Sequence, residues 1–321
     1  MIKFGIIGSG WRSEFYLRIA KLVPEKFFVS GIYIRNENKR VAFAQKYDVS
    51  IFDNLEALLN TDFDFIVSCV SKESIAETAQ FLANKGISVL TETPVNTSGL
   101  EGKIQVAEQF HLMPRNQAYK KIINSGILGE VHQVQLSCCH DYHAASLIRF
   151  FLDINDEIPE NTTVVLPDKL TRYNGRNGYA EPISVNSDEK ITIFNFGEKT
   201  AIYDFNYEQY FSDIRASRII IKGTNGEIVN NVCTYLKNGF PHSFEIKRNS
   251  LGTEENLDGY SLISITGNGE ILYESPFKYA RLSDEDIAIA TCLLKMKEYC
   301  TNNTSFYNTI DAFNDYKLCF K

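Results

Sequence analysis

The stretch Ile2-Lys3-Phe4-Gly5-Ile6-Ile7-Gly8-Ser9-Gly10-Trp11-Arg12-Ser13 decides the fold of this chain. Its first six residues form an apolar run, which is typical of a buried strand, and a helical spacing of apolar residues follows at 15–23. Gly8 and Gly10 between them allow a tight turn and a close approach of the backbone to a ligand. The amides at the start of such a helix hold phosphate groups. The segment therefore predicts the first unit of a Rossmann domain that binds a dinucleotide.

The first third of the chain alternates short apolar runs with helical patterns. This alternation is typical of a parallel sheet wound with helices. Only residues 95–103 lie between Pro94 and the next predicted strand, whereas a parallel crossover usually needs about a dozen residues. We therefore expect that a helix has been lost there or that this part is built differently. The further strands are predicted at 28–34, 63–69, 87–91 and 104–108, and the helices at 39–47 and 74–85.

From about Val131 the pattern changes to longer alternating segments, which predict an antiparallel sheet. Ser283 and Asp286 form a capping-box pattern, so a helix should begin there. The predicted fold class is α/β, with an N-terminal Rossmann parallel sheet at 1–115 and a C-terminal α+β domain at 116–321. This second domain should contain a large open, mainly antiparallel sheet and C-terminal helices within 283–319. Its clearest strands are expected at 190–196, 200–207, 217–222 and 262–266, and its helices at 287–299 and 307–319.

Composition limits the classes of partner. The net charge of −7 argues against binding to nucleic acid or to an anionic membrane, and no apolar run is long enough for a membrane-spanning helix. The seven cysteines lack the paired spacings of a zinc site or a disulfide scaffold, so we expect reduced thiols in the cytoplasm and no metal. A small-molecule substrate is the expected partner.

The end of the second predicted strand bears on the choice of cofactor. Dinucleotide-binding proteins that prefer NAD usually place an acidic residue here, but this chain has Ile34-Arg35-Asn36. Arg35 could pair with the 2′-phosphate of NADP, although it could equally be a solvated loop residue. The nearby Lys39 and Arg40 favour the first interpretation. We therefore predict that NADP(H) is preferred and that NAD(H) is possible.

Four segments follow one another in an order that resembles the Gfo/Idh/MocA family of oxidoreductases. They are Thr91-Glu92-Thr93-Pro94, Gln109-Phe110-His111-Leu112-Met113-Pro114, the segment 126–131 and Tyr142-His143 to Arg149. The resemblance implies a Rossmann domain followed by a domain with an open sheet, and oxidation or reduction of sugars or polyols with NAD or NADP. It also implies a homodimer or homotetramer. The cofactor-binding residues that we predict are Gly8, Ser9, Gly10, Trp11, Arg12, Ile34, Arg35, Asn36, Cys69, Val70, Ser71, Glu92, Thr93, Pro94 and Gln109.

The catalytic positions implied by the resemblance are only partly kept. Thr93 stands where the family has a lysine, and Cys139 stands where it has an aspartate four residues before the catalytic histidine. His143 matches that histidine, and a histidine side chain titrates near neutral pH. We therefore predict His143 as the acid or base and Thr93 as a group that orients the substrate, with His111, His140, Asp141 and Tyr142 possible neighbours of this site. His143 could instead serve only the start of its helix.

Two functions follow from this pattern. The first is an NAD(P)-dependent oxidoreductase acting on a sugar, a polyol or a related carbonyl or hydroxyl compound. The alternative is a catalytically silent dinucleotide-binding sensor or regulatory protein, which Thr93 and Cys139 favour. In either case the second face of the antiparallel sheet needs a cover, for which a second copy of the chain is expected. Ile193, Ile202 and Ile220 are candidate apolar positions for this contact, and the sequence does not assign them to one face or the other.

Overall fold

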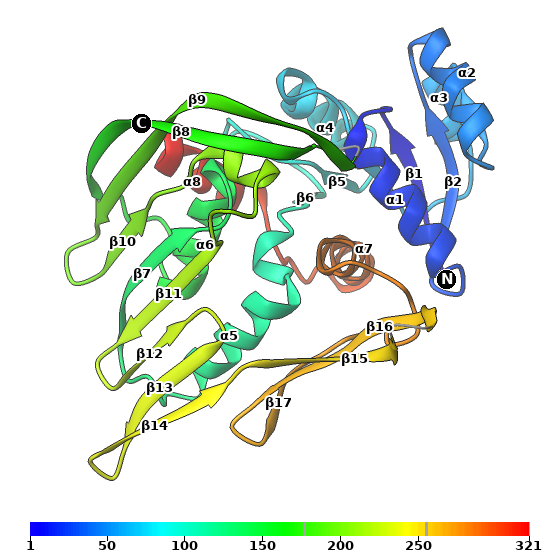
Figure 1. The fold of residues 1–321 in the computed structure, drawn as a ribbon. Coiled ribbons are helices and arrows are strands. Elements are labelled where there is room, and N and C mark those ends of the chain that lie inside the picture. The colour runs from blue at the N-terminus through cyan, green and yellow to red at the C-terminus, as the bar shows by residue number, and fades with distance from the viewer. Residues whose placement is uncertain (176–177, 254–255, 321) are drawn as a thin grey trace. The chain divides into compact units, whose positions relative to one another are not determined.

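The computed structural model describes residues 1–175, 178–253 and 256–320. The chain folds as two compact units, coloured by residue number in Figure 1. The first unit comprises Met1–Asn116, Asn249–Ser264 and Glu274–Lys317. The second comprises Gln117–Arg248, Ile265–Tyr273 and the C-terminal residues from Leu318.

The first unit contains a six-stranded parallel sheet in the order β3-β2-β1-β4-β5-β6. This is the strand order of a Rossmann fold, so the predicted fold class of the N-terminal part is confirmed. The prediction missed β3 and α3, because their two and five residues are too short to show a period. The strands are β1 Ile2–Ile7, β2 Phe27–Tyr33, β3 Ile51–Phe52, β4 Phe65–Ser68, β5 Val89–Thr91 and β6 Ile104–Val106, and the helices are α1 Trp11–Leu22, α2 Glu37–Lys46, α3 Leu55–Leu59, η1 Lys72–Ser74 and α4 Ile75–Asn84.

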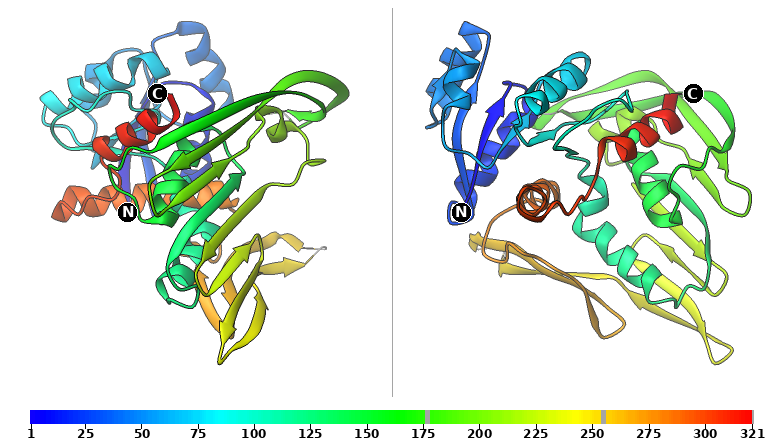
Figure 2. Two further views of the ribbon diagram at one scale, coloured as in Figure 1. Left: turned by 90° about the vertical axis from the view of Figure 1, so that its left-hand side faces the viewer. Right: turned by 180° about the vertical axis from the view of Figure 1, so that it is seen from behind.

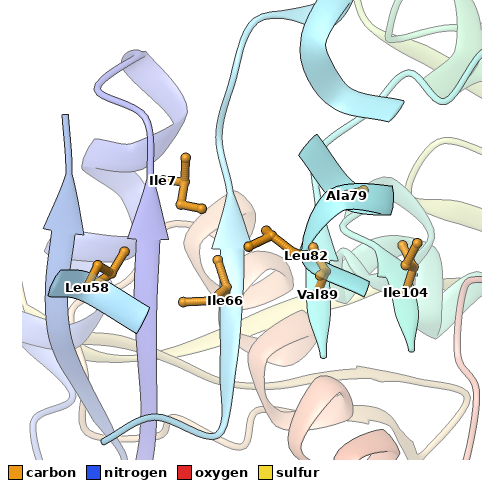
Figure 3. Packing of buried hydrophobic residues seen from close by; sticks show 7 residues of the cluster. All are labelled: Ile7, Leu58, Ile66, Ala79, Leu82, Val89 and Ile104. Atoms are coloured by element: carbon orange, nitrogen blue, oxygen red, sulfur yellow. The ribbon is translucent and has the colours of Figure 1, made fainter. Parts of the chain in front are cut away.

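An apolar cluster holds helices α3 and α4 against this sheet, as Figure 3 shows. Its strand residues come from a sheet with helices on both faces, which is why these strands are apolar throughout rather than alternating. Burial of an aliphatic side chain of this size contributes roughly 1.5–3 kcal/mol. The cluster consists of Ile7, Leu58, Ile66, Ala79, Leu82, Val89 and Ile104.

The connection from β5 to β6, residues 92–103, contains no helix, which answers the question raised by its short sequence. β5 and β6 are nevertheless parallel neighbours. The C-terminal part of the chain supplies a cover for this edge, because the backbone amide of Val106 donates to the Tyr307 carbonyl at 2.8 Å. Tyr307 also packs with Val95 and Ala312 in a buried cluster. A later segment thus covers the edge strand where a crossover helix is missing.

Helix α7, Asp284–Asn302, begins at the predicted capping box of Ser283 and Asp286. It contacts α1, β1, β4 and η2 (Phe110–Leu112), and it belongs to the first unit. The prediction that the helices within 283–319 belong to the second domain therefore differs from the structure. The reason is that α7 is buried against the Rossmann sheet, which sequence order alone does not reveal. Helix α8, Thr309–Phe320, also lies in the first unit as far as Lys317.

The second unit is built on an eight-stranded sheet in the order β14-β13-β12-β11-β7-β10-β9-β8, with α5 Pro114–Asn124 and α6 Asp141–Leu152. Only the pair β7 and β10 is parallel, so the large, mainly antiparallel sheet is confirmed. The predicted strand at 200–207 ends early, because Asn206 caps the short helix η3, Tyr207–Phe211. The strands of this sheet are β7 Val131–Ser137, β8 Glu160–Gly175, β9 Gly178–Asn195, β10 Thr200–Tyr203, β11 Arg218–Gly223, β12 Gly226–Val229, β13 Val232–Lys237 and β14 Phe240–Glu245. A separate three-stranded sheet consists of β15 Lys247–Thr253, β16 Asn256–Gly267 and β17 Glu270–Glu274.

The two faces of the eight-stranded sheet differ, and Figure 2 gives two further views of it. Helix α6 packs on β7, and Leu136, Ala201 and Ile219 on the strands of that region are fully buried. The opposite face carries a row of residues that are register partners across neighbouring strands. Their side chains are partly exposed, so this face is largely open. The row runs Ile193, Ile202, Gln135, Ile220 and Val229.

Candidate functional site

The glycine turn after β1 is shaped for close approach of a ligand. Gly8 has φ 111°, and a Cβ at this position would lie 2.4 Å from the Cys69 carbonyl oxygen. Gly10 caps α1 without a side-chain hydrogen bond, so the first amides of the helix receive no side-chain cap from it. Ser13 stands at the third glycine position of the motif, and its buried hydroxyl donates to the Gly10 carbonyl at 2.6 Å. These features fit the pyrophosphate of a dinucleotide.

The predicted cofactor residues gather at one edge of the Rossmann sheet. Because all its strands are parallel, their carboxyl ends share this edge, and ligands of such sheets bind outside it. β1 and β4 are neighbours there, with the remaining strands continuing outward in opposite directions, which is the usual position of the cofactor crevice. The segments that follow the strand ends are Gly8–Gly10 after β1, Ile34–Asn36 after β2, Cys69–Ser71 after β4, Glu92–Pro94 after β5 and Gln109 after β6.

The loop after β2 is held by its own side chains. The Arg40 guanidinium donates to the carbonyls of Ile34 and Arg35, at 3.1 and 3.0 Å. Asn36 caps α2 by accepting from the Lys39 amide at 3.0 Å. Arg35 itself is exposed. Arg40 and Asn36 thus have structural roles in this loop, and the Arg35 side chain is the cation that the loop presents to solvent.

The Arg12 side chain lies beside the glycine turn and pairs with two carboxylates. Its Nη1 lies 2.8 Å from Glu285 Oε1, and its Nε lies 3.4 Å from Glu92 Oε2. The Tyr16 hydroxyl donates to the other Glu92 oxygen at 2.6 Å. Burial opposes the charge on Arg12, but the Glu92 and Glu285 carboxylates outweigh it and raise the pKa of Arg12. This network links the turn to α7 and to the segment after β5. No sequence pattern indicated Tyr16 or Glu285 as members of it.

Glu108 is a fully buried carboxyl group that follows β6. Its Oε1 accepts from the Phe110 amide at 2.9 Å, and burial raises the pKa of Glu108 to about 8. The next residue is Gln109, whose side-chain Nε2 donates to Glu285 Oε1 at 3.2 Å. The sequence signal for Glu108 was an acidic residue at the end of the predicted strand 104–108, and our site prediction did not include it.

Replacing Glu108 with glutamine is expected to remove a pH dependence of stability. Because the pKa of Glu108 is raised in the folded state, the folded protein binds more protons than the unfolded chain between about pH 4.5 and 8. Its burial therefore destabilises the fold progressively as the pH rises through this window, by about 3–4 kcal/mol between pH 5 and 9. Urea unfolding of the unmodified protein and Glu108→Gln at both pH values measures this difference. An equal pH dependence in the two proteins would contradict the assignment.

Thr93 and Pro94 follow β5 in the first unit and are half-buried, with a cis peptide bond between them. His111 also belongs to this unit, where its ring stacks on Tyr307 at 4.8 Å. Burial lowers the pKa of His111 to about 3. A histidine that stays neutral and stacked in a core in this way is structural. His111 belongs to the first unit, whereas His143 belongs to the second.

His143 lies in the first turn of α6 and is 4% exposed. Its backbone amide donates to the His140 carbonyl at 3.1 Å, and its ring packs against those of Tyr142 and His140, with centroids 4.5 and 5.1 Å away. Cys139 just before is fully buried, and its Sγ lies 3.7 Å from that of Cys138. The structure thus brings His143 together with two of its expected neighbours, His140 and Tyr142.

His140 stands at the centre of an aromatic cluster. The Tyr210 hydroxyl lies 2.8 Å from His140 Nδ1, and the Tyr207 ring lies edge-to-face with the imidazole at 5.8 Å. Asp141, the fourth expected neighbour, donates its backbone amide to the Tyr203 hydroxyl at 3.1 Å. Tyr207 and Tyr210 come from η3, so no local sequence pattern links them to His140.

Among the described residues, none of the helices has the length and apolar character needed to cross a membrane. Residues 2–113 match the model of the oxidoreductase family with an NAD-binding Rossmann fold, Gfo/Idh/MocA. No curated protein matches the sequence significantly.

Solved structures resemble the whole chain at low identity. An oxidoreductase from Agrobacterium radiobacter in complex with NAD+, L-tartaric acid and magnesium is 14% identical, with a TM-score of 0.63 over 99% of this chain and 94% of that one. A myo-inositol dehydrogenase from Corynebacterium glutamicum is 12% identical, with a TM-score of 0.63 over 99% and 94%. Biliverdin reductase from Synechocystis, in complex with biliverdin and NADP+, is 12% identical, with a TM-score of 0.60 over 99% and 96%. These likenesses show the fold, and the family model matches less than half of the chain, residues 2–113.

Proposed function

We propose that the protein is an NAD(P)-dependent oxidoreductase that acts on a hydroxyl or carbonyl group of a sugar, a polyol or a related compound. The observation that carries this proposal is the glycine turn at the carboxyl edge of the sheet, within residues that match an NAD-binding family. The first unit holds the dinucleotide and the second unit binds the substrate. When bound, the nicotinamide group accepts or supplies a hydride.

The residues of the first unit hold the cofactor. Gly8, Ser9 and Gly10 and the first amides of α1 receive the pyrophosphate. Arg35 pairs with a 2′-phosphate, and Thr93 offers a hydroxyl where the family resemblance implies a lysine. His143 in the second unit gives or takes the proton. Arg12 acts indirectly, by fixing the turn through Glu92 and Glu285.

An assay of nicotinamide oxidation and reduction tests the function directly. The unmodified chain is mixed with NADPH or NADH and a panel of sugar-derived and polyol-derived ketones, and with NADP+ or NAD+ and the corresponding alcohols. Turnover of any panel member, monitored by absorbance of the reduced nicotinamide, supports the proposal. Dinucleotide binding without turnover would favour the sensor.

Arg35→Ala is expected to abolish a preference for NADPH over NADH. A charge-assisted hydrogen bond contributes roughly 1.5–3 kcal/mol, which corresponds to about 10- to 150-fold in affinity. Trp11 is the only tryptophan and lies in the first turn of α1, so its fluorescence reports binding of either dinucleotide. Lys26→Ala, at the amino end of β2, is the matched control and should keep the preference. Equal affinities for NADPH and NADH in the unmodified protein would exclude this role of Arg35.

The catalytically silent sensor remains a second candidate because of two observations. Thr93 cannot act as an acid or base near neutral pH, and Cys139 is a fully buried thiol where the resemblance implies a carboxylate. A sensor of this kind binds the dinucleotide and changes a protein contact rather than a substrate. The sensor hypothesis predicts that Trp11 fluorescence reports dinucleotide binding and that no compound of the panel is turned over.

We further propose that two copies of the chain pair through the open face of the eight-stranded sheet. Ile193, Ile202 and Ile220 lie in one row of register partners on that face, and Ile193 is 44% exposed. A self-complementary apolar row of this kind is best covered by a symmetric partner. The family resemblance points to the same assembly.

Ile193→Lys combined with Ile220→Lys is expected to convert an oligomer into a monomer. In an oligomer, the two ammonium groups would face the same groups and apolar side chains of the second copy across the symmetric interface, which is unfavourable. In a monomer, they would remain in solvent. Light scattering at micromolar concentration measures the mass. Ile214→Lys, at a loop residue that is 66% exposed, is the control and should leave the mass unchanged. A monomeric unmodified protein would contradict the proposal.

A further inference from the structure

Two cysteines stand side by side in the turn between β7 and α6. β7 ends at Ser137 and α6 begins at Asp141, so Cys138 and Cys139 lie outside both elements. In an extended strand, neighbouring side chains point to opposite faces of the sheet, which keeps their ends apart. Here the chain bends at both residues, and the two Sγ atoms lie 3.7 Å from each other. The turn therefore brings two adjacent thiols into contact.

The two thiols differ in their exposure to solvent. Cys138 is partly exposed, whereas Cys139 is fully buried. A dissolved oxidant can therefore reach Cys138 directly and Cys139 only through it. Both are free thiols, and both belong to the second unit. An accessible thiol that is attacked first, with a second thiol next to it that resolves the product, is the usual arrangement of redox-sensitive cysteines.

We propose that Cys138 and Cys139 are an oxidation site, at which hydrogen peroxide converts the two thiols into a disulfide between neighbouring residues. This inference does not depend on the proposed function. The Cys138 thiolate attacks one peroxide oxygen, so that an S–O bond forms, the O–O bond breaks and the leaving hydroxide takes up a proton. Cys139 then attacks the Cys138 sulfur: an S–S bond forms, the S–O bond breaks and water leaves. In sum, the two thiols lose two electrons and two protons, and the peroxide is reduced to two molecules of water.

The resulting disulfide should be easy to reduce again. The Cα atoms of neighbouring residues are about 3.8 Å apart, whereas most disulfides join Cα atoms that are about 4.4–6.8 Å apart. A bond between Cys138 and Cys139 is therefore strained, and strained disulfides are the ones that are readily reduced. A thiol of low molecular weight, such as reduced glutathione, is expected to restore both cysteines. The site thus responds reversibly to peroxide.

Closing this bond should loosen the start of α6. The two sulfur atoms must approach from 3.7 Å to about 2.05 Å, which requires the backbone of the turn to rotate. Tyrosine hydroxyls hold the next two backbone amides: the His140 amide donates to Tyr210 at 2.9 Å, and the Asp141 amide donates to Tyr203 at 3.1 Å. Rotation of the residues just before these amides weakens both bonds. Oxidation thereby alters the helical turn that contains His143.

Mass spectrometry of the full chain tests the oxidation site. The reduced protein is treated with an excess of hydrogen peroxide, blocked with N-ethylmaleimide in denaturant and digested with trypsin. The tryptic peptide 122–149 contains Cys138 and Cys139 as its only cysteines. It should be lighter than the reduced peptide by two hydrogen atoms, carry no maleimide, and take up two maleimides after treatment with reduced glutathione. Two maleimides before that treatment, or a Cys138 sulfinic acid beside a maleimide-labelled Cys139, would overturn the inference.

Variants separate the roles of the two thiols. Cys138→Ser should leave the buried Cys139 unoxidised, and Cys139→Ala should stop Cys138 at the sulfenic acid, which dimedone traps. Cys300→Ser, at a partly exposed cysteine of α7, is the matched control and should form the disulfide as the unmodified chain does. Disulfide bonds between two chains, or oxidation of Cys139 that persists in Cys138→Ser, would contradict the assignment.

Hydrogen exchange followed by NMR tests the effect on α6. The His140 and Asp141 amides should exchange about two- to tenfold faster in the oxidised than in the reduced protein, because each loses the contribution of one hydrogen bond. The double variant Cys138→Ser with Cys139→Ala is the control, in which peroxide should not change the exchange. Unchanged exchange in a protein that contains the disulfide overturns the effect on α6, and thiols that resist peroxide overturn the whole inference.

Discussion

Replacing His143 with alanine is expected to lower turnover by about 10²–10⁴-fold while NADPH binding stays nearly unchanged. A proton-transfer group contributes mainly in the transition state, so kcat falls and the affinity for the dinucleotide does not. His143 belongs to the second unit, whereas the glycine turn belongs to the first, so the substitution leaves the turn intact. Steady-state kinetics with the best panel substrate, together with Trp11 fluorescence titration, measures both quantities.

The burial of His143 requires a control for folding. The side chain is 4% exposed and packs on Tyr142 and His140, so alanine could leave a cavity. His143→Phe fills this space without an acid or base, and it should show the same loss of kcat as His143→Ala. Turnover that survives in the phenylalanine variant would remove His143 as the proton-transfer residue.

Replacing Arg12 with alanine is expected to destabilise the first unit by about 3–5 kcal/mol, since it leaves a buried carboxylate without its counter-charge. The side chains of Arg12 and Glu92 are 18% and 10% exposed in this pair, so solvent can replace little of the lost interaction. Burial already raises the pKa of Glu92 despite the neighbouring Arg12. Loss of the guanidinium should raise it further. The variant should therefore lose most stability at alkaline pH, where Glu92 must ionise.

Urea unfolding of Arg12→Ala measures the change in the free energy of unfolding. Lys46→Ala is the control: it removes a pair with Glu14 of α1 in which the two side chains are 59% and 32% exposed. An ion pair open to solvent contributes about 1 kcal/mol or less. Adding Glu92→Gln to Arg12→Ala should recover part of the stability, because the unpaired charge is removed. Equal losses of stability in Arg12→Ala and Lys46→Ala would contradict a larger contribution from the buried pair.

The sequence by itself determined the Rossmann unit and the edge of its sheet at which the predicted cofactor residues lie. A strand, two glycines and a helix are local features, and parallel strands bring all their carboxyl ends to one edge whatever the details of packing. The apolar runs at β1, β4 and β5 and the capping box of α7 were likewise readable, because each depends on neighbours along the chain. The same holds for the open antiparallel sheet, where alternation over 190–196 and 217–222 follows the two-residue period of a strand.

Tertiary structure alone decided which side chains meet. Arg12 is predicted from its motif as a cofactor residue, but its partner Glu285 comes from α7, which the chain places against α1 only after folding. The same is true of Tyr210 at His140 and of Tyr307 beside the edge strand β6. These contacts join residues that are far apart in sequence, and a hydrogen bond or an ion pair depends on distances of about 3 Å, which no periodicity encodes. Sequence pattern therefore sets the backbone frame of this protein, and the packing of distant elements sets the ion pairs and hydrogen bonds between its side chains.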